Sequence, residues 1–188
     1  MKNLNLLCLF LLLAFLNACS GGANDQEANA DGFLVIEEAL KEQFGDNAYY
    51  TDLNISHNKS IGNIIAVTAT SDPASLKMGQ WTHANDTWTQ TSDITLEVPV
   101  GMQASDFMFR LGDPIDLGKL GELVEKSKEK LESEKEIPNP SLQMAVVKIP
   151  KDGERSKIEY LVLLQPENGG TTFTYSYDLY GEFISMDY

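Results

Sequence analysis

The chain has 188 residues, of which 14 are Lys or Arg and 28 are Asp or Glu, so its formal net charge is −14. Hydrophobic residues make up 43% and charged residues 22%, a balance that excludes disorder throughout the chain. The acidity argues against binding to DNA or RNA, because phosphate has to be met by a basic face. We therefore expect no nucleic acid among the partners.

The first segment has the pattern of a secretion signal. Lys2 gives a short basic start, and Leu6 to Leu16 form an unbroken apolar run of 11 residues. A membrane-spanning helix needs about 20 such residues. The run is too short to span a bilayer and is typical of the core of a signal peptide. We expect residues 1–18 to be a leader that is removed.

The apolar run ends in Leu16-Asn17-Ala18-Cys19. This tetrapeptide resembles the lipobox of bacterial lipoproteins. The resemblance implies that Cys19 carries a diacylglycerol and anchors the chain to a lipid bilayer in the bacterial cell envelope. Because Ser20 rather than Asp follows the cysteine, it also favours the outer membrane, with either a periplasmic or a surface-facing domain. The alternative is an ordinary secreted protein in which Cys19 is incidental.

Two cysteines occur in the chain, Cys8 and Cys19. Cys8 would leave with the leader and Cys19 would be acylated, so the mature chain would have no disulfide. In an oxidising envelope it would have to be stable through its core alone, for which its length suffices. Residues 19–30 are rich in small and polar residues and are predicted to be a flexible tether.

The first predicted element after the tether is a helix with Asp31 as N-cap. Its apolar positions are spaced by three and four, which is one stripe on a helix, and they are Phe33, Ile36, Leu40 and Phe44. Gly45 is a natural end for this helix. Strand patterns follow, over residues 49–56, 64–70, 80–82 and 87–89, with 94–98 extending the series.

A second helix is predicted after Asp116, again as N-cap. Its apolar stripe is Leu117, Leu120, Val124 and Leu131, with Ser127 at the remaining position. Pro138 and Pro140 end it. Strand patterns resume over residues 142–149, 158–164, 172–177 and 183–186.

Both halves have the same order of elements, which indicates an internal duplication. We predict an α+β fold of two repeats, residues 31–105 and 106–188, each a helix plus a four-stranded antiparallel meander. The helices are expected to pack on one face of the sheet. A single α+β domain whose halves merely look alike is the alternative.

The two helix stripes and the closing segment 177–183, with its aromatic–Asp–x–x–Gly turn, resemble the tandem units of the PepSY-like and β-lactamase-inhibitor-protein-like families. The first half departs from this pattern, because its tip at residues 83–86 has no Gly. The resemblance implies a secreted or lipid-anchored binding or inhibitory module rather than an enzyme.

Residues for catalysis are few. The chain has two histidines, His57 and His83, each predicted to be a solvated turn residue. It has no Gly-x-Ser-x-Gly elbow and no EF-hand spacing. We expect no catalytic residue, no metal and no cofactor. The alternative is a small hydrolase in which His57 or His83 is the base.

Aromatic residues give the one specific indication of a binding surface. Trp81 and Trp88 flank the expected four-residue tip 83–86, which predicts that they are cross-strand neighbours on one face. Phe173, Tyr175 and Tyr177 alternate along a strand and share a face. Because one face of each sheet has to be covered, packing in the core is the default interpretation of these five rings. If they face water instead, they are the candidate surface for a protein or glycan of the envelope. The predicted role is a non-catalytic, lipid-anchored binding module, or else an accessory subunit of an outer-membrane assembly.

Overall fold

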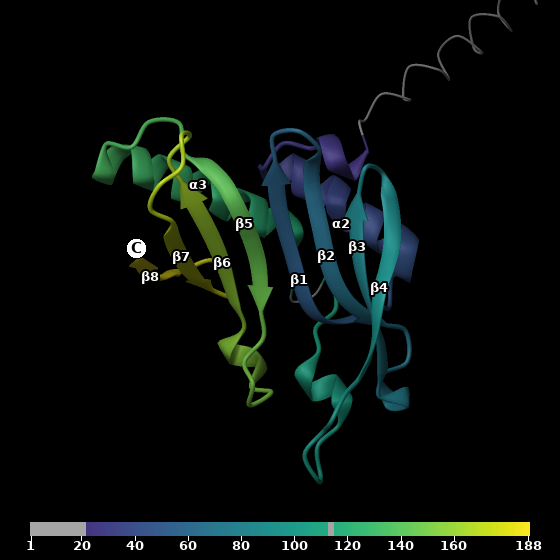
Figure 1. The fold of residues 1–188 in the computed structure, drawn as a ribbon. Coiled ribbons are helices and arrows are strands. Elements are labelled where there is room, and N and C mark those ends of the chain that lie inside the picture. The colour runs from purple at the N-terminus through teal and green to yellow at the C-terminus, as the bar shows by residue number, and fades with distance from the viewer. Residues whose placement is uncertain (1–21, 113–114) are drawn as a thin grey trace, which may run out of the picture.

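In the computed structural model, residues 22–112 and 115–188 are described, and eight antiparallel strands form one sheet (Figure 1). The predicted leader, residues 1–18, and Cys19 lie outside the described residues. The sheet has the spatial order β4-β3-β2-β1-β5-β6-β7-β8. The strands are β1 Tyr49–Asn58, β2 Gly62–Thr70, β3 Lys77–Ala84, β4 Thr87–Thr95, β5 Ser141–Lys148, β6 Glu159–Gln165, β7 Phe173–Asp178 and β8 Phe183–Asp187. The predicted α+β class with an antiparallel sheet is confirmed.

Two α-helices accompany the sheet, α2 Ala30–Phe44 and α3 Leu117–Lys135. Short 3-10 turns occur at η1 Ala23–Asp25, η2 Pro73–Ser75, η3 Ala104–Phe107 and η4 Arg155–Lys157. In chain order one helix precedes β1 to β4 and the other precedes β5 to β8. The two series of strands meet at β1 and β5, where Leu53 lies opposite Val147 and Ile55 opposite Ala145.

The first helix follows its predicted stripe. Phe33, Ile36 and Leu40 are fully buried. Gly45 ends the helix with φ of 90° and donates its N–H to the carbonyl of Lys41. The N-cap differs from the prediction: Asn29, not Asp31, accepts the N–H of Gly32 at 2.9 Å. An amide oxygen caps a helix as well as a carboxylate, so the sequence alone leaves both starts open.

The second helix starts as predicted, with the Asp116 carboxylate accepting the N–H of Lys119 at 3.2 Å. Its apolar stripe is buried. Two tyrosine hydroxyls of the sheet form hydrogen bonds with the helix. The N–H of Asp116 donates to the Tyr160 hydroxyl at 3.2 Å, and the Ser127 and Tyr177 hydroxyls lie 2.7 Å apart. Residues of both helices and of the strands share one hydrophobic core.

The helices also touch each other. The N–H of Leu117, at the start of α3, donates to the buried carboxylate of Glu37 in α2 at 2.9 Å. Gly121 lies against the start of α2, where a Cβ would overlap the Asn29 carbonyl and reach 2.7 Å from the Ala30 Cα. Gly121 is therefore required by a close approach of two backbones.

Residues 22–30, expected as part of a flexible tether, are packed on the sheet. The Asn24 amide donates to the carbonyl of Asn63 at 2.7 Å and accepts the N–H of Asp86 at 2.7 Å. Asn63 in turn donates to the carbonyls of Ala23 and Gln26 at 3.2 and 2.7 Å. Asn24 and Asn63 are both buried. The prediction of a flexible tether is thus wrong for residues 22–30. The side-chain amides of Asn24 and Asn63 bond to backbone groups that water would solvate in a free chain.

The boundary predicted between residues 105 and 106 falls within η3. Within the described residues, no helix is long and apolar enough to cross a membrane.

Candidate functional site

The structure places the aromatic stripe of β7 in the core. Phe173, Tyr175 and Tyr177 are 7%, 1% and 0% exposed. Burial raises the pKa of Tyr175 to about 12 and also raises the pKa of Tyr177, since a phenolate is disfavoured away from water. Of the two alternatives that the sequence left open, core packing holds for this stripe.

The two tryptophans are not paired as predicted. Asn85 and Asp86 form a two-residue turn with φ of 49° and 56°, so that Trp81 lies opposite Gln90 and His83 opposite Trp88. Asn and Asp tolerate this left-handed conformation. The hairpin is therefore two residues tighter than the four-residue tip predicted from the sequence, and the pairing of Trp81 with Trp88 is wrong.

Both indoles pack inward against α2. Their ring centroids lie 5.6 Å (Trp81) and 5.1 Å (Trp88) from that of Phe44, and both side chains are partly buried. All five rings predicted as a binding surface thus belong to the core or its border. A face that stacks aromatic rings on a ligand is not formed by these residues.

The two histidines have separate environments. His83 is only 5% exposed, its ring centroid is 4.8 Å from that of Trp88, and its Nδ1 is buried without a partner among the described residues. Burial lowers the pKa of His83, which favours the neutral imidazole. The prediction of a solvated tip is wrong for His83, because the tighter turn places it in β3. His57 lies at the end of β1, with Nδ1 3.0 Å from the Asn63 amide oxygen.

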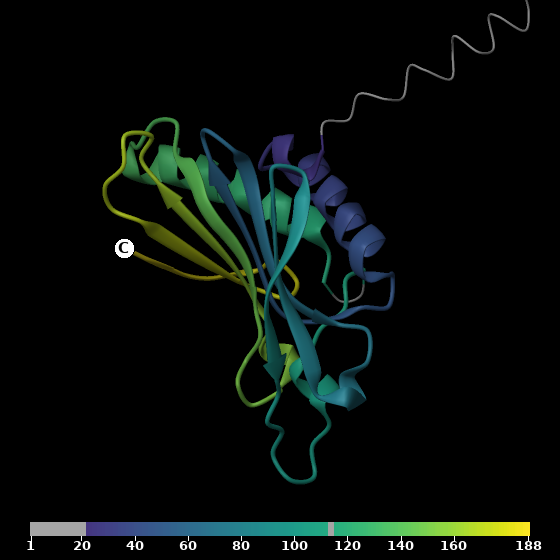
Figure 2. The same cartoon turned by 45° about the vertical axis from the view of Figure 1, so that its right-hand side comes forward.

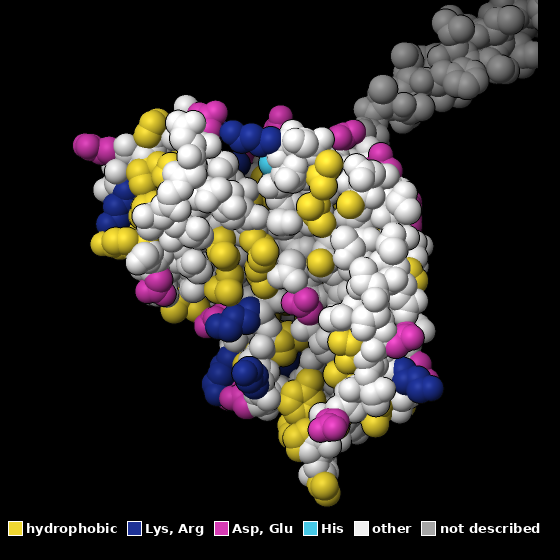
Figure 3. All heavy atoms as spheres, in the orientation of Figure 1, with side chains coloured by type: hydrophobic (Ala, Val, Ile, Leu, Met, Phe, Trp, Pro, Cys, Tyr) yellow, Lys and Arg dark blue, Asp and Glu magenta, His cyan; other side chains and the backbone are white. Residues whose placement is uncertain are grey.

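The opposite face of the sheet carries an apolar surface that the sequence analysis missed. Side chains alternate along a strand, so the neighbours of the core residues point to the face turned toward the viewer in Figures 1 and 3. The register aligns two rows across the central strands: Ala66–Asn54–Val146–Leu161 and Ile64–Ser56–Met144–Leu163. The six apolar members, here called the apolar band, are Ile64, Ala66, Met144, Val146, Leu161 and Leu163.

All six residues of the apolar band are partly exposed. Figure 3 shows hydrophobic side chains at the surface over β2, β5 and β6. The signal in the sequence was the continuous apolar runs 64–67, 144–147 and 160–164, since a strand with one wet face alternates and a strand covered on both faces does not. These runs predict a second buried face.

Acidic groups border the band. Asp52 accepts the Asn54 amide at 3.0 Å and has no cationic partner within the described residues. Burial raises the pKa of its carboxyl. Lys148 is paired with Glu159 at 2.8 Å. The face therefore presents an uncompensated, partly desolvated carboxylate beside an apolar centre.

A groove of about 750 Å³ lies at the end of the sheet where residues 26–29 dock. Glu125, Glu129 and Glu132 of α3 line it together with His57 and Ser141. The Ser141 hydroxyl donates to the carbonyl of Gln165 at 3.4 Å, and no hydrogen bond joins Ser141 to His57 in the described part of the chain. Within residues 22–112 and 115–188, no three His, Cys, Asp or Glu side chains are placed to hold a metal ion.

No family model, no curated protein and no solved structure matches the chain. A functional argument therefore depends on the geometry of the face, the groove and the docked segment, together with the sequence motif at Cys19.

Proposed function

We propose that this protein is a lipid-anchored envelope lipoprotein that binds a partner protein on the open face of its sheet and catalyses no reaction. The observation that carries the proposal is the apolar band. Its six residues lie on β2, β5 and β6, and the polar side chains of Asn54 and Ser56 on β1 separate the β2 pair from the other four. Apolar patches of this kind on a folded protein mark interaction sites.

A protein fits this face better than a glycan. The rows of the open face contain aliphatic, thioether, hydroxyl and amide side chains and no ring on which a sugar could stack, whereas an apolar surface on a partner protein can bury them. The aliphatic band matches an aliphatic counterpart of similar shape. Asp52 and the net charge of −14 favour a partner with basic residues around that counterpart.

The architecture supports the same role. We interpret the chain as two repeats, each a helix followed by a four-stranded meander, with both helices covering one face. The element order is the same in each half, the first strand of each half pairs with the other, and Figure 2 draws both helices on one side of the sheet. Covering one face and leaving the other free is what a sheet-based binding module needs.

The segment before α2 sets how the domain would be held at the membrane. Asn24 is docked on the sheet, and Cys19 is five residues earlier. Five residues span at most about 17 Å. With a lipid on Cys19, the end of the sheet that holds Asn24 and the groove faces the bilayer.

The anchor is tested by Cys19→Ala in the source cells. We expect this variant to leave the membrane fraction and to lose labelling by a palmitate analogue, while a Ser20→Ala control keeps both. A Cys19→Ala protein that is still labelled contradicts lipidation at this residue.

The face is tested by charge insertion. Val146→Asp and Leu161→Asp should each weaken partner binding by at least about 30-fold, the effect of losing roughly 2 kcal/mol at an interface centre. Thr89→Asp on the outer strand of the same face is the matched control and should bind like the wild type. Far-UV circular dichroism and a thermal melt check that each variant folds. If folded Val146→Asp and Leu161→Asp both bind normally, the proposal fails.

A further inference from the structure

Arginine usage in this chain is unusual. Of its 14 basic residues only Arg110 and Arg155 are arginines, and both line the same small cavity, of about 270 Å³. The ion pairs among the described residues all use lysine. Two arginines have therefore no carboxylate partner in the described part of a protein with 28 acidic residues.

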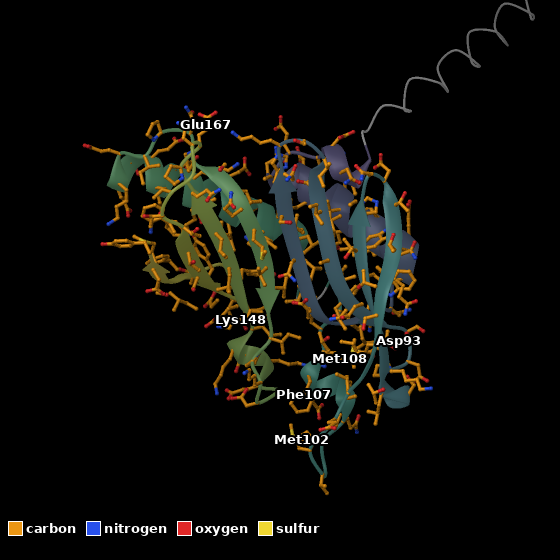
Figure 4. The ribbon with its side chains drawn as sticks, in the orientation of Figure 1. Asp93, Met102, Phe107, Met108, Lys148 and Glu167 are labelled. Atoms are coloured by element: carbon orange, nitrogen blue, oxygen red, sulfur yellow. The ribbon has the colours of Figure 1, made fainter. Side chains whose placement is uncertain are left out.

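The cavity lies where the two halves of the chain meet. Tyr49 comes from the start of β1, Ser105 and Met108 from η3 and the residue that follows it, and Arg155 and Ile158 from η4 and its C-cap. In Figure 4, Met108 and Phe107 lie below the central strands, at the opposite end from Glu167 of the groove, with Lys148 nearby. Figure 3 shows basic side chains beside a hollow at this end.

Neither guanidinium is saturated by the protein. Arg110 binds the Asn47 amide oxygen and lies over the Tyr49 ring with its Cζ 5.7 Å from the centroid, yet its Nε is buried without a partner among the described residues. Arg155 uses one Nη to donate to the Ser105 carbonyl at 2.9 Å. Each arginine has five N–H donors in a planar fork. A buried donor without an acceptor is costly, and an anion in the cavity would supply the acceptor.

We infer that this cavity is a binding site for a carboxylate attached to a short apolar group. The planar forks of two arginines match the two oxygens of a carboxylate. Met108 and Ile158 provide the apolar walls, and the volume suits a group the size of one amino-acid residue. The net charge of the chain repels a phosphate, which carries up to two charges, more strongly than a single carboxylate.

This site shares no lining residue with the apolar band. The ligand chemistry is shared by a free N-acylated amino acid and by the C-terminus of a peptide. The cavity lies at the Tyr49 end of β1, whereas the docked residues 22–29 contact the region of His57 and Asn63 at its other end. Ten residues of strand separate these ends, about 30 Å. The ligand would therefore enter far from Asn24.

Having only two arginines makes the test direct, because a ¹⁵N-labelled sample of residues 19–188 has two Arg Nε–Hε correlations, and single Arg→Lys variants assign them. N-acetyl-leucine, a Gly-Gly-Leu peptide, N-acetyl-leucine amide and inorganic phosphate are titrated separately. We expect N-acetyl-leucine or the peptide to shift the Arg110 signal saturably, with a Kd of about 1 mM or tighter. The stronger of the two identifies the source of the carboxylate.

Arg110→Lys and Arg155→Lys keep the charge but lose the fork, and each should weaken binding at least tenfold. Lys151→Gln, a charge change on the neighbouring turn, should not. The inference is overturned by an absence of saturation up to about 10 mM, by equal binding of the amide, by binding of phosphate alone, or by arginine variants that bind like the Lys151→Gln control. Intact backbone spectra of the Lys variants separate a binding effect from misfolding.

Discussion

Glu37 joins the two helices, and its removal gives the sharpest stability prediction. Its carboxylate is buried, accepts the N–H of Leu117 at 2.9 Å and pairs with Lys41 at 2.7 Å. The Leu117 N–H is at the first position of α3 and has no partner within that helix. Glu37→Ala leaves this donor buried and unpaired and removes a charge-assisted hydrogen bond, at a cost of about 1.5–3 kcal/mol.

The assay is urea unfolding of residues 19–188 followed by circular dichroism. With a slope of about 2 kcal/mol per molar urea, the midpoint of Glu37→Ala should fall by roughly 1 M. Glu38→Ala is the matched control, since Glu38 also pairs with Lys41, at 3.1 Å, but is 69% exposed and should change stability by less than about 0.5 kcal/mol. Equal midpoints for the two variants would refute the role of Glu37 at the start of α3.

Three further predictions concern stability. Gly121→Ala should destabilise by about 1–3 kcal/mol because its Cβ overlaps the backbone of Asn29 and Ala30. Gly118→Ala, whose Cβ reaches only the side chains of Asp116 and Leu34 at 3.0 Å, should cost less; thermal melts compare the two variants. Burial lowers the pKa of His83, so the unfolded chain takes up the proton first and stability should fall as the pH drops below 6.5; urea midpoints of His83→Gln should lack this loss. Burial raises the pKa of Asp52, so stability falls as pH rises above 3.8, and Asp52→Asn should melt higher at pH 7.

The local structure was accessible from the sequence wherever one strong pattern decides it. The stripe Phe33, Ile36 and Leu40 with Gly45 at its end predicted α2, and Asp116 before Leu117 predicted the start of α3. These signals act over three or four residues. The strands followed from β-branched and aromatic runs, and most of their ends lie within three residues of those observed; the exception is β4, which continues from Thr87 to Thr95 where the pattern ended at residue 89.

Register and long-range contacts were not accessible in this way. The sequence His83-Ala84-Asn85-Asp86 is compatible with a two-residue or a four-residue turn, and the choice decides which residue faces Trp88. The hydrogen bonds of Asn24 with Asn63 join residues 39 positions apart, and no local pattern marks them. The pairing of β1 with β5 also joins residues far apart in the sequence, so no local pattern marks it.

The residues of the exposed surface were not identified from the sequence, and there is a physical reason. Aromatic rings are the largest side chains and gain most from burial, so Tyr175 and Tyr177 went to the core. The surface was left to smaller aliphatic side chains such as Val146 and Leu161. Their signal was the loss of alternation in three strands, which indicates a covered second face more directly than aromatic content does.

The most direct test of the central claim is site-specific photocrosslinking in the source cells. A photoreactive phenylalanine is placed at Val146 in the apolar band, and the control places it at Leu34, an apolar residue of α2 that is 46% exposed. The account predicts one dominant protein adduct from position 146 that is absent from position 34 and is suppressed by adding Leu161→Asp. Adducts that are the same from both positions, or none from position 146 in a membrane-bound and folded protein, would contradict it.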